Sequence, residues 1–393
     1  MEKIVDRIDC CGCGACYNTC SQNAIKMIAD SSGFLYPVIN NQLCIDCGAC
    51  VRSCPIMYRD KNTITIKQQK IFASHNNDVD EWKSSSSGGM FDLLAAYVAE
   101  RKGYIVGVAY NSNMEVHHEV AEKEDEIKRF KGSKYVQSEI GKVYGQVKDL
   151  LRQDKYVLFT GTPCQVEGLK CYLHNLDQNK LITCDIICSA VPSPRAFHDY
   201  ISFLQTKYAK RVINLNMKDK TEGWPFAKSR VYFENGESLY DTIDADLWIN
   251  LWATELINRP CCEKCRFTNY NRPGDVTIGD CWPVYHKKDK FSHPNGISQL
   301  MINSEKGERV FEEIKTRMTI MPITKEYSWQ SKLEYPIRNN SLSESFWTDY
   351  EELGFLKVVK KYGVYSPLNY KKQKYKRMLK HLLSVVYHIL VKK

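Results

Sequence analysis

Two runs of closely spaced cysteines near the N-terminus carry the clearest chemistry in this sequence. The first run has Cys10, Cys13, Cys16 and Cys20, and the second has Cys44, Cys47, Cys50 and Cys54. Three thiolates on one tight loop can reach three corners of a 4Fe-4S cube, whereas a zinc site with four cysteines needs two separate pairs. The spacing therefore predicts two 4Fe-4S clusters, which pass single electrons.

The pattern is similar to that of bacterial two-cluster ferredoxins, in which each run gives its fourth cysteine to the other cluster. This resemblance places Cys10, Cys13, Cys16 and Cys54 on one cluster, and Cys20, Cys44, Cys47 and Cys50 on the other. Cys11 fits no ligand position in this scheme. Ser21 stands where such ferredoxins usually have proline, which alters the stiffness of the loop and not the ligation.

The composition predicts two or three domains in a reducing compartment. The chain has 393 residues, 43% of them hydrophobic, which is enough for real cores. Its 17 cysteines and the absence of an apolar leader at the start of this sequence predict a cytoplasmic location. We find no apolar run long enough to span a bilayer, so no membrane span is expected.

The net charge of +9 belongs almost entirely to the C-terminal tail. Residues 371–393 hold eight lysines and arginines and no acid, which leaves a charge of +1 for residues 1–370. A nearly neutral body does not indicate a surface for nucleic acid. The tail also places Met378, Leu379, Leu382, Leu383, Val386 and Leu390 at helical spacing. Such a basic amphipathic helix suits either peripheral contact with the inner face of a membrane or docking on the protein's own core.

The rest of the chain alternates between apolar strands and amphipathic helices. Strands are expected at 104–110, 116–121, 156–160, 181–188, 230–233 and 276–279, and helices at 90–101, 139–153, 166–175 and 194–208. We expect an α/β (α+β) body behind a small ferredoxin-like α+β domain. The predicted divisions are 1–58, 70–155, 156–330 and a helical extension at 331–393. Glu234–Glu237 has the turn chemistry of a hairpin, because Asn-Gly tolerates positive φ.

Two loops could hold an anionic ligand. The first runs through four serines into Gly88 and Gly89 and then a helix; small residues and a helix start favour a diphosphate, although such residues are more often a simple cap. The second follows a strand and reads Thr-Gly-Thr at 160–162, at a sheet edge where α/β proteins bind cofactors. It lacks the Gly-Lys-Ser/Thr ending of a Walker loop.

Four further cysteines could complete a third cluster. Cys262 and Cys265 form a CxxC pair, Cys188 ends an apolar strand, and Cys164 follows the second loop. Ordinary buried thiols explain this spacing equally well.

Several motifs together resemble the coenzyme F420 hydrogenase/dehydrogenase beta-subunit family. They are Ser-Ser-Gly-Gly at 86–89, Gly-Ser-Lys-Tyr-Val-Gln-Ser at 132–138, Phe-Thr-Gly-Thr-Pro-Cys-Gln at 159–165, Cys-Ser-Ala-Val-Pro-Ser-Pro at 188–194, and Cys-x-x-Cys at 262–265 followed by Asp-Val-Thr-Ile-Gly-Asp at 275–280. The resemblance covers roughly residues 70–330. It implies an FAD-binding α/β body that also carries a 4Fe-4S cluster.

The resemblance also implies which residues act. FAD would be held by Ser87, Gly88, Gly89, Lys134, Tyr135, Ser138, Gly161 and Thr162. The third cluster would use Cys164, Cys188, Cys262 and Cys265, with Cys281 as an alternative for one of them. Residues 188–191 read Cys-Ser-Ala-Val where relatives often have Cys-His-Gly-Val, a departure on the substrate side of the flavin.

The function implied is that of an oxidoreductase that passes electrons between ferredoxin-type clusters, FAD and an organic substrate. Its electron partner would be a ferredoxin or another redox protein. Its substrate would be a small or lipid-linked molecule, and surface polysaccharide biosynthesis is a setting suggested by bacterial relatives. The alternative is an electron-transfer subunit of a larger complex, with no substrate of its own.

Overall fold

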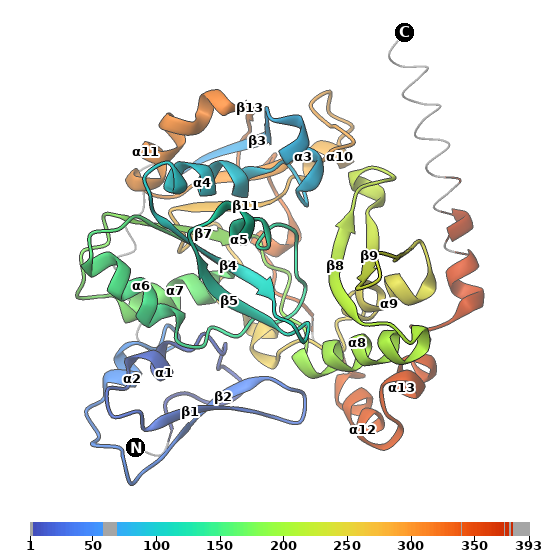
Figure 1. The fold of residues 1–393 in the computed structure, drawn as a ribbon, viewed down its shortest axis with the longest axis horizontal. Helices are drawn as coiled ribbons and strands as arrows, with labels where there is room; N and C mark the ends of the chain where they lie inside the picture. Colours follow the sequence, from blue (N-terminus) through green and yellow to red (C-terminus); the bar gives the residue numbers. More distant parts are fainter. Residues whose placement is uncertain (1–2, 58–68, 339, 373, 377–378, 380–393) are drawn as a thin grey trace.

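A mixed eight-stranded sheet forms the centre of the molecule (Figure 1). The computed structural model describes residues 3–57, 69–338, 340–372, 374–376 and 379. The strand order is β13-β3-β12-β11-β7-β6-β4-β5. The strands are β3 (Lys70–Asn76), β4 (Tyr104–Tyr110), β5 (Val116–Ala121), β6 (Val157–Gly161), β7 (Leu181–Ile186), β11 (Val276–Asp280), β12 (Ser298–Ile302) and β13 (Met318–Pro322).

The four middle strands β11, β7, β6 and β4 are parallel, and antiparallel strands flank them on both sides. Val157, Leu158 and Phe159 of β6 are buried without alternation, as expected for a parallel strand covered on both faces. All four parallel strands end at the same edge. Loops that follow them therefore meet there, and this edge carries the candidate site.

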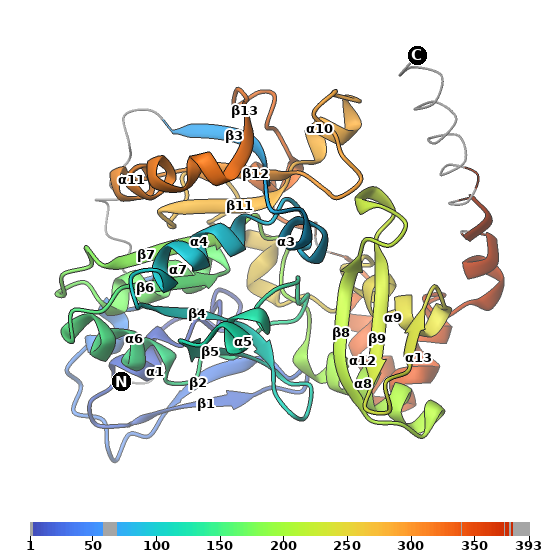
Figure 2. The ribbon, with the colours of Figure 1, turned by 45° about the horizontal axis from the view of Figure 1, so that its top comes forward.

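Helices cover both faces of the sheet (Figure 2). On one face α4 (Met90–Ala99) and α11 (Glu305–Ile314) bury Val98 and Phe311 against Leu158 and Ile182. On the other, α6 (Val143–Arg152) and α7 (Pro163–Tyr172) form a core with residues of β4, β6 and β7. Three short helices lie in connecting loops: α3 (Val79–Ser84), α5 (Glu124–Lys128) and α10 (Trp282–His286).

A second lobe has its own core, built from a three-stranded sheet and four helices (Figure 1). Its strands are β8 (Val212–Asp219), β9 (Lys228–Phe233) and β10 (Ser238–Tyr240), and its helices are α8 (Pro194–Tyr208), α9 (Ile243–Trp252), α12 (Ser343–Leu353) and α13 (Phe355–Lys361). Tyr200 and Trp248 are fully buried between them. Ser193 caps α8, because its Oγ accepts a hydrogen bond from the N–H of Ala196 at 3.0 Å.

The N-terminal module, residues 3–57, contains the hairpin of β1 (Ile25–Ala29) and β2 (Leu35–Ile39) and the short helices α1 (Ala15–Thr19) and α2 (Ala49–Arg52). Gly14 and Gly48 precede the two helices with φ of 72° and 70°. Both cysteine loops thus need glycine where they turn into a helix. The module shares a core with the body, since Cys13 and Ala15 pack with residues of α6 and α7.

The structure contains every strand and helix that the sequence predicts and several more. The strands expected at 104–110 and 116–121 and the helix at 194–208 are confirmed at both ends. The remaining predicted elements are present with shifted ends. The strands β3, β8, β12 and β13 and the helices α9 and α11 were not predicted. In the hairpin turn Gly236 has a positive φ of 85°, whereas Asn235 does not. The boundary expected between 155 and 156 falls within one sheet.

Most of the tail, including the expected apolar positions other than Leu379, lies outside the described residues. Lys374 forms an ion pair with Asp241. Leu379 and Leu368 are exposed. Among the described helices, none combines the length and apolar character needed to cross a bilayer.

Candidate functional site

The N-terminal module contains the two groups of four cysteines that the resemblance to two-cluster ferredoxins predicts. Cys10, Cys13, Cys16 and Cys54 are all buried. Burial, and then the neighbouring thiols of Cys10 and Cys54, raise the pKa of Cys16. A second group, Cys20, Cys44, Cys47 and Cys50, surrounds a cavity of about 30 Å³. Cys47 is exposed, so this second group lies nearer to solvent.

A third group of cysteines lines a cavity of about 60 Å³ between the module and the body. We call it the cysteine cavity; its cysteines are Cys11, Cys164, Cys188, Cys261, Cys262 and Cys265. Cys164 lies in the first turn of α7, Cys188 follows β7, and the last three belong to a short turn after α9. All four cysteines that the resemblance implies are therefore brought together here, along with two that sequence reasoning did not assign.

Cys11 and Cys281 differ from their expected places. The thiol of Cys11, expected to be a bystander, lies within hydrogen-bonding reach of Cys13 and Cys164, so it connects the module to the cysteine cavity. Cys281 does not line this cavity and instead packs with Trp82, Val284 and Ile297. Among the described residues no three Cys, His, Asp or Glu side chains are arranged around a single metal ion.

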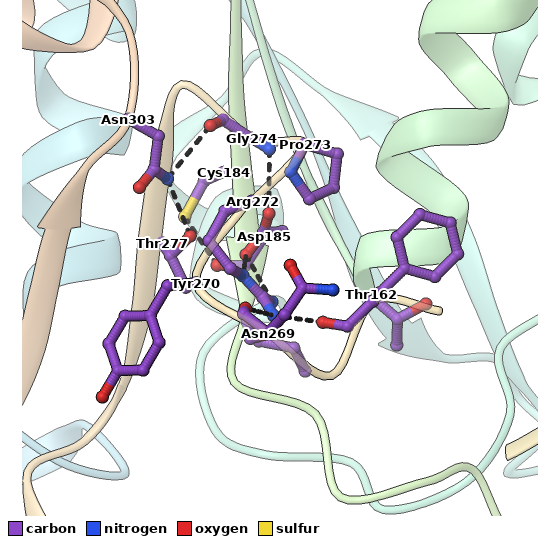
Figure 3. Close-up of polar contacts among 12 residues, drawn as sticks. Thr162, Cys184, Asp185, Asn269, Tyr270, Arg272, Pro273, Gly274, Thr277 and Asn303 are labelled. Atoms are coloured by element: carbon purple, nitrogen blue, oxygen red, sulfur yellow. Dashed lines mark hydrogen bonds and ion pairs between the residues drawn. The ribbon is translucent and has the colours of Figure 1, made fainter. Parts of the chain in front are cut away.

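A buried ion pair fixes the loop that follows Cys265 (Figure 3). Asp185 at the end of β7 accepts hydrogen bonds from Arg272 at 2.8 Å and from the N–H of Gly274 at 2.8 Å. Arg272 also donates to the carbonyl of Phe267 at 2.7 Å. Because every member has partners, this pair ties the cysteine-bearing loop rigidly to the central sheet.

A large cavity of about 930 Å³ opens at the carboxyl ends of β6, β7 and β11. Of the residues expected to hold FAD, it is lined by Ser87, Gly89, Lys134, Tyr135, Ser138, Gly161 and Thr162. Gly88 is the exception. A Cβ at this position would overlap the carbonyl oxygen of Ser74 and approach the N–H of Ser298, so strand packing requires this glycine.

Lys134 lines the large cavity, but its ammonium is engaged by the backbone. Its Nζ donates to the carbonyls of Arg129 and Lys131, each at 3.0 Å. Burial lowers the pKa of Lys134 to about 7. Beside it, the ring of Tyr135 stacks on that of Trp252 with centroids 4.4 Å apart. Lys134 thus holds its loop, and the two rings supply an aromatic wall.

A hydrogen-bond network supports the cavity and reaches the cysteines. Gln165 donates to Ser138 Oγ at 3.1 Å and accepts from Thr162 Oγ1 at 3.0 Å. His118 contacts Ser138 Oγ through Nδ1 at 3.1 Å, and burial lowers the pKa of this histidine to about 4. Thr162 Oγ1 lies 3.2 Å from Cys164 Sγ. The network therefore joins the two cavities.

The two cavities also share one wall, because Cys188, Ala190, Val191 and Lys332 line both. Ala190 has a φ of 78°, in the left-handed region that favours glycine. This explains physically why an alanine is unusual here. The part of the shared wall that residues 188–191 form is thus a tight backbone turn with small side chains, and Lys332 adds one long side chain to the wall.

The large cavity suits a large anionic ligand with an aromatic part. Asp92 Oδ2 and Trp252 Nε1 line it and are buried without a hydrogen-bond partner in the described structure. Its lining holds Lys131, Lys218, Lys287 and Lys332, and Lys134 as a partly charged fifth lysine, against Asp92, Asp280 and Glu326. Trp224 and Trp282 stack near Lys218, with centroids 4.6 Å apart. These features fit a flavin dinucleotide.

Comparison with known proteins identifies both parts of the chain. Residues 154–326 match the family described as the C terminus of the coenzyme F420 hydrogenase/dehydrogenase beta subunit, and residues 9–57 match the 4Fe-4S dicluster domain. The body of the chain is therefore similar to this beta-subunit family, and a ferredoxin-type domain precedes it, as the sequence motifs predicted.

Individual relatives match the body and the module. The F subunit of the F420H2 dehydrogenase of Methanosarcina mazei is 21% identical over 82% of this chain and 86% of its own length. A ferredoxin of Methanocaldococcus jannaschii is 36% identical over 18% of this chain and 83% of its own length. A chain of the F420-reducing nickel–iron hydrogenase complex from Methanosarcina barkeri is 16% identical, with a TM-score of 0.46 over 68% of this chain and 89% of that one. The family matches and the first two relatives make the protein an iron–sulfur relative of oxidoreductase subunits.

Proposed function

We propose that this protein is an iron–sulfur flavoprotein oxidoreductase. Electrons would pass between the clusters of the N-terminal module, a third 4Fe-4S cluster in the cysteine cavity and FAD in the large cavity. The observation that carries this proposal is the wall shared by the two cavities, formed by Cys188, Ala190, Val191 and Lys332. Two cofactor sites that are separated only by this shared wall are close enough together to suit electron transfer between them.

The third cluster would be held by Cys164, Cys188, Cys265 and one cysteine of the 261–262 pair. Cys164, Cys188 and Cys265 all line the small cysteine cavity, so the three thiols lie near one another. Cys261 acts on Cys265 in the same way, whereas Cys262 lies beside Cys261. The fourth position therefore has two adjacent candidates, and a cube needs only one of them.

FAD would be held where the helices α4 and α7 begin. Ser87 and Gly89 lie at the start of α4, and Thr162 at the start of α7, positions that favour phosphate oxygens. The rings of Tyr135 and Trp252 would face the aromatic part of the ligand. When bound, FAD supplies the exchange between single electrons and two-electron chemistry.

The residues of the chain then position the ligand and limit the access of water. The network of Gln165, Ser138 and His118 keeps the floor of the large cavity in one arrangement. Lys218 pairs with Asp280 at 2.6 Å near the stacked tryptophans, which leaves this side of the cavity nearly neutral. An organic substrate would meet that side. A role in surface polysaccharide biosynthesis rests on the family resemblance.

The second candidate is an electron-transfer subunit without a substrate of its own. The name of the M. mazei relative, which is one subunit of a dehydrogenase, favours it. In that case a partner protein would cover the mouth of the large cavity and supply or receive the electrons. Reduction of bound flavin by a reduced ferredoxin, with no small molecule turned over, would be its signature.

Anaerobic purification followed by flavin extraction and iron counting tests the proposal. The wild-type protein should contain FAD, and Cys188→Ala should lose about four iron atoms, the content of one cube. Cys184→Ala is the matched control, because Cys184 is a buried thiol of β7 that lines neither cavity. Unchanged iron in Cys188→Ala would refute the third cluster. A preparation that neither contains nor binds FAD would refute the flavin assignment.

A further inference from the structure

Arg259 is a body residue whose side chain enters the N-terminal module. It is fully buried, with 0% of its surface exposed. Its Nε donates to the carbonyl of Cys10 at 2.7 Å and its Nη2 to the carbonyl of Leu35 at 2.9 Å. Its Nη1 donates to the side chain of Gln137 at 2.8 Å. The guanidinium therefore lies against the first cysteine loop.

The first cysteine loop has no room for a side chain where the guanidinium passes. A Cβ added at Gly12 would lie 2.7 Å from Arg259 Nη1. The guanidinium carbon also lies 4.3 Å from the centroid of the Tyr36 ring and 5.4 Å from that of Phe34. The cysteine loop and these two aromatic rings together hold the positively charged guanidinium in one place.

This buried charge lacks a carboxylate. Among the described residues no Asp or Glu pairs with Arg259, since its three acceptors are neutral oxygens. The buried Arg272, by contrast, pairs with Asp185 at 2.8 Å. A fully buried cation is costly unless an opposite charge compensates it. The groups around Arg259 that can carry negative charge are Cys10, then the Tyr36 hydroxyl, and then Cys261 and Cys11. Burial raises the pKa of Tyr36, so its hydroxyl stays neutral and the thiols are left as the source of negative charge.

A 4Fe-4S cluster held by four thiolates supplies that missing charge. Such a cluster is anionic, and it gains one further negative charge on reduction. Net charge and hydrogen bonds near the sulfurs are among the factors that set its potential. A fixed cation beside it favours the reduced, more negative form. The cation should thus raise the reduction potential.

We propose that Arg259 is the electrostatic counter-charge of the cluster held by Cys10, Cys13, Cys16 and Cys54, and that it sets this cluster's potential above that of the second module cluster. Electrons would then collect on the module cluster that faces the body. The inference rests on the 4Fe-4S clusters of residues 1–57 and not on FAD or the third cluster. Arg259 acts on the cluster from outside its ligand set, so it is a positioning residue.

The test is a redox titration of the full-length protein, purified anaerobically and followed by EPR. Arg259→Gln removes the charge and Arg259→Lys keeps it. Arg195→Gln is the matched control, because Arg195 also donates to a carbonyl of the module, that of Ser31, but is half-exposed and pairs with Glu351. Iron is counted in each variant.

The Arg259→Gln protein should keep its iron, and the midpoint potential of one module cluster should fall by about 59 mV. This shift corresponds to a tenfold change in the equilibrium constant of a one-electron reduction. Arg259→Lys and Arg195→Gln should stay at the wild-type value. If Arg259→Gln loses the iron of one cube, Arg259→Lys must retain it. Unchanged midpoint potentials in Arg259→Gln, or equal iron loss in Arg259→Gln and Arg259→Lys, would overturn the proposal.

Discussion

The N-terminal module and the large cavity are constructed in opposite ways. In the module, three cysteines of each group lie within one short loop, and Gly14 or Gly48 turns that loop into a helix. The large cavity takes its lining from the loops after several strands and from the second lobe. A local site depends on a few residues and their glycines. An assembled site depends on the whole fold, so changes far from it should act on it.

The largest effect is expected when a cluster ligand of the module is removed. Cys16→Ala should remove about four iron atoms and one EPR signal, because a cube needs its four thiolates. The unfolding transition of the body should persist, since Cys16 packs within a cluster formed by module residues. Iron counting and thermal unfolding check this. Loss of the body transition in Cys16→Ala, with Cys184→Ala unaffected, would contradict a site whose ligands come from the module alone.

Gly88→Val should destabilise the whole body by about 3 kcal/mol or more, because the new side chain meets backbone atoms that cannot move aside. Those atoms are the carbonyl oxygen of Ser74 and the N–H of Ser298, in two neighbouring strands. Denaturant unfolding measures the change. Gly145→Ala is the control, since its Cβ would meet nothing closer than 4.0 Å. A Gly88→Val protein of normal stability that had lost only its flavin would show that Gly88 belongs to the ligand site after all.

The pH dependence tests whether the floor of the large cavity is tied to folding. Burial holds the pKa of His118 at about 4, below its ordinary value of 6.5, so the unfolded chain binds the proton more readily between these values. The stability that the neutral, buried His118 contributes is therefore fully present above pH 6.5 and is lost as the pH falls toward 4. The loss between pH 7 and pH 4.5 should be about 2 kcal/mol, at 1.36 kcal/mol per pKa unit.

His118→Gln should be less stable at pH 7 but should lose that part of the pH dependence. Chemical denaturation at several pH values compares the two proteins. Equal slopes in the wild-type protein and His118→Gln would mean that His118 is not the group that titrates.

The smallest expected effect concerns the wall between the cavities. Ala190→Gly should stabilise the protein by up to about 1 kcal/mol, because glycine adopts the positive φ of 78° without strain, although its greater freedom in the unfolded chain offsets part of the gain. Ala190→Val should be destabilising, since a branched side chain tolerates this region poorly. Thermal unfolding of both variants checks the order. Equal stability of the two would contradict the strained turn.

The sequence by itself determined the metal chemistry of the module. Cysteine ligands that lie two or three residues apart converge whatever the rest of the fold does, so their spacing alone predicts a cluster. It also predicted several strands and helices, such as 104–110 and 194–208, because their hydrophobic patterns and caps are local. The ordered motifs predicted the family.

Only the tertiary structure decided which distant residues meet. It revealed that Gly88 serves strand packing, that Lys134 points at backbone carbonyls, and that Cys11 reaches the cysteine cavity. It also placed Arg259 beside Cys10, far apart in the sequence. No local pattern encodes such contacts, because they arise where the ends of parallel strands and the loops of separate domains come together. The charge that faces the first cluster was therefore invisible until the chain was folded.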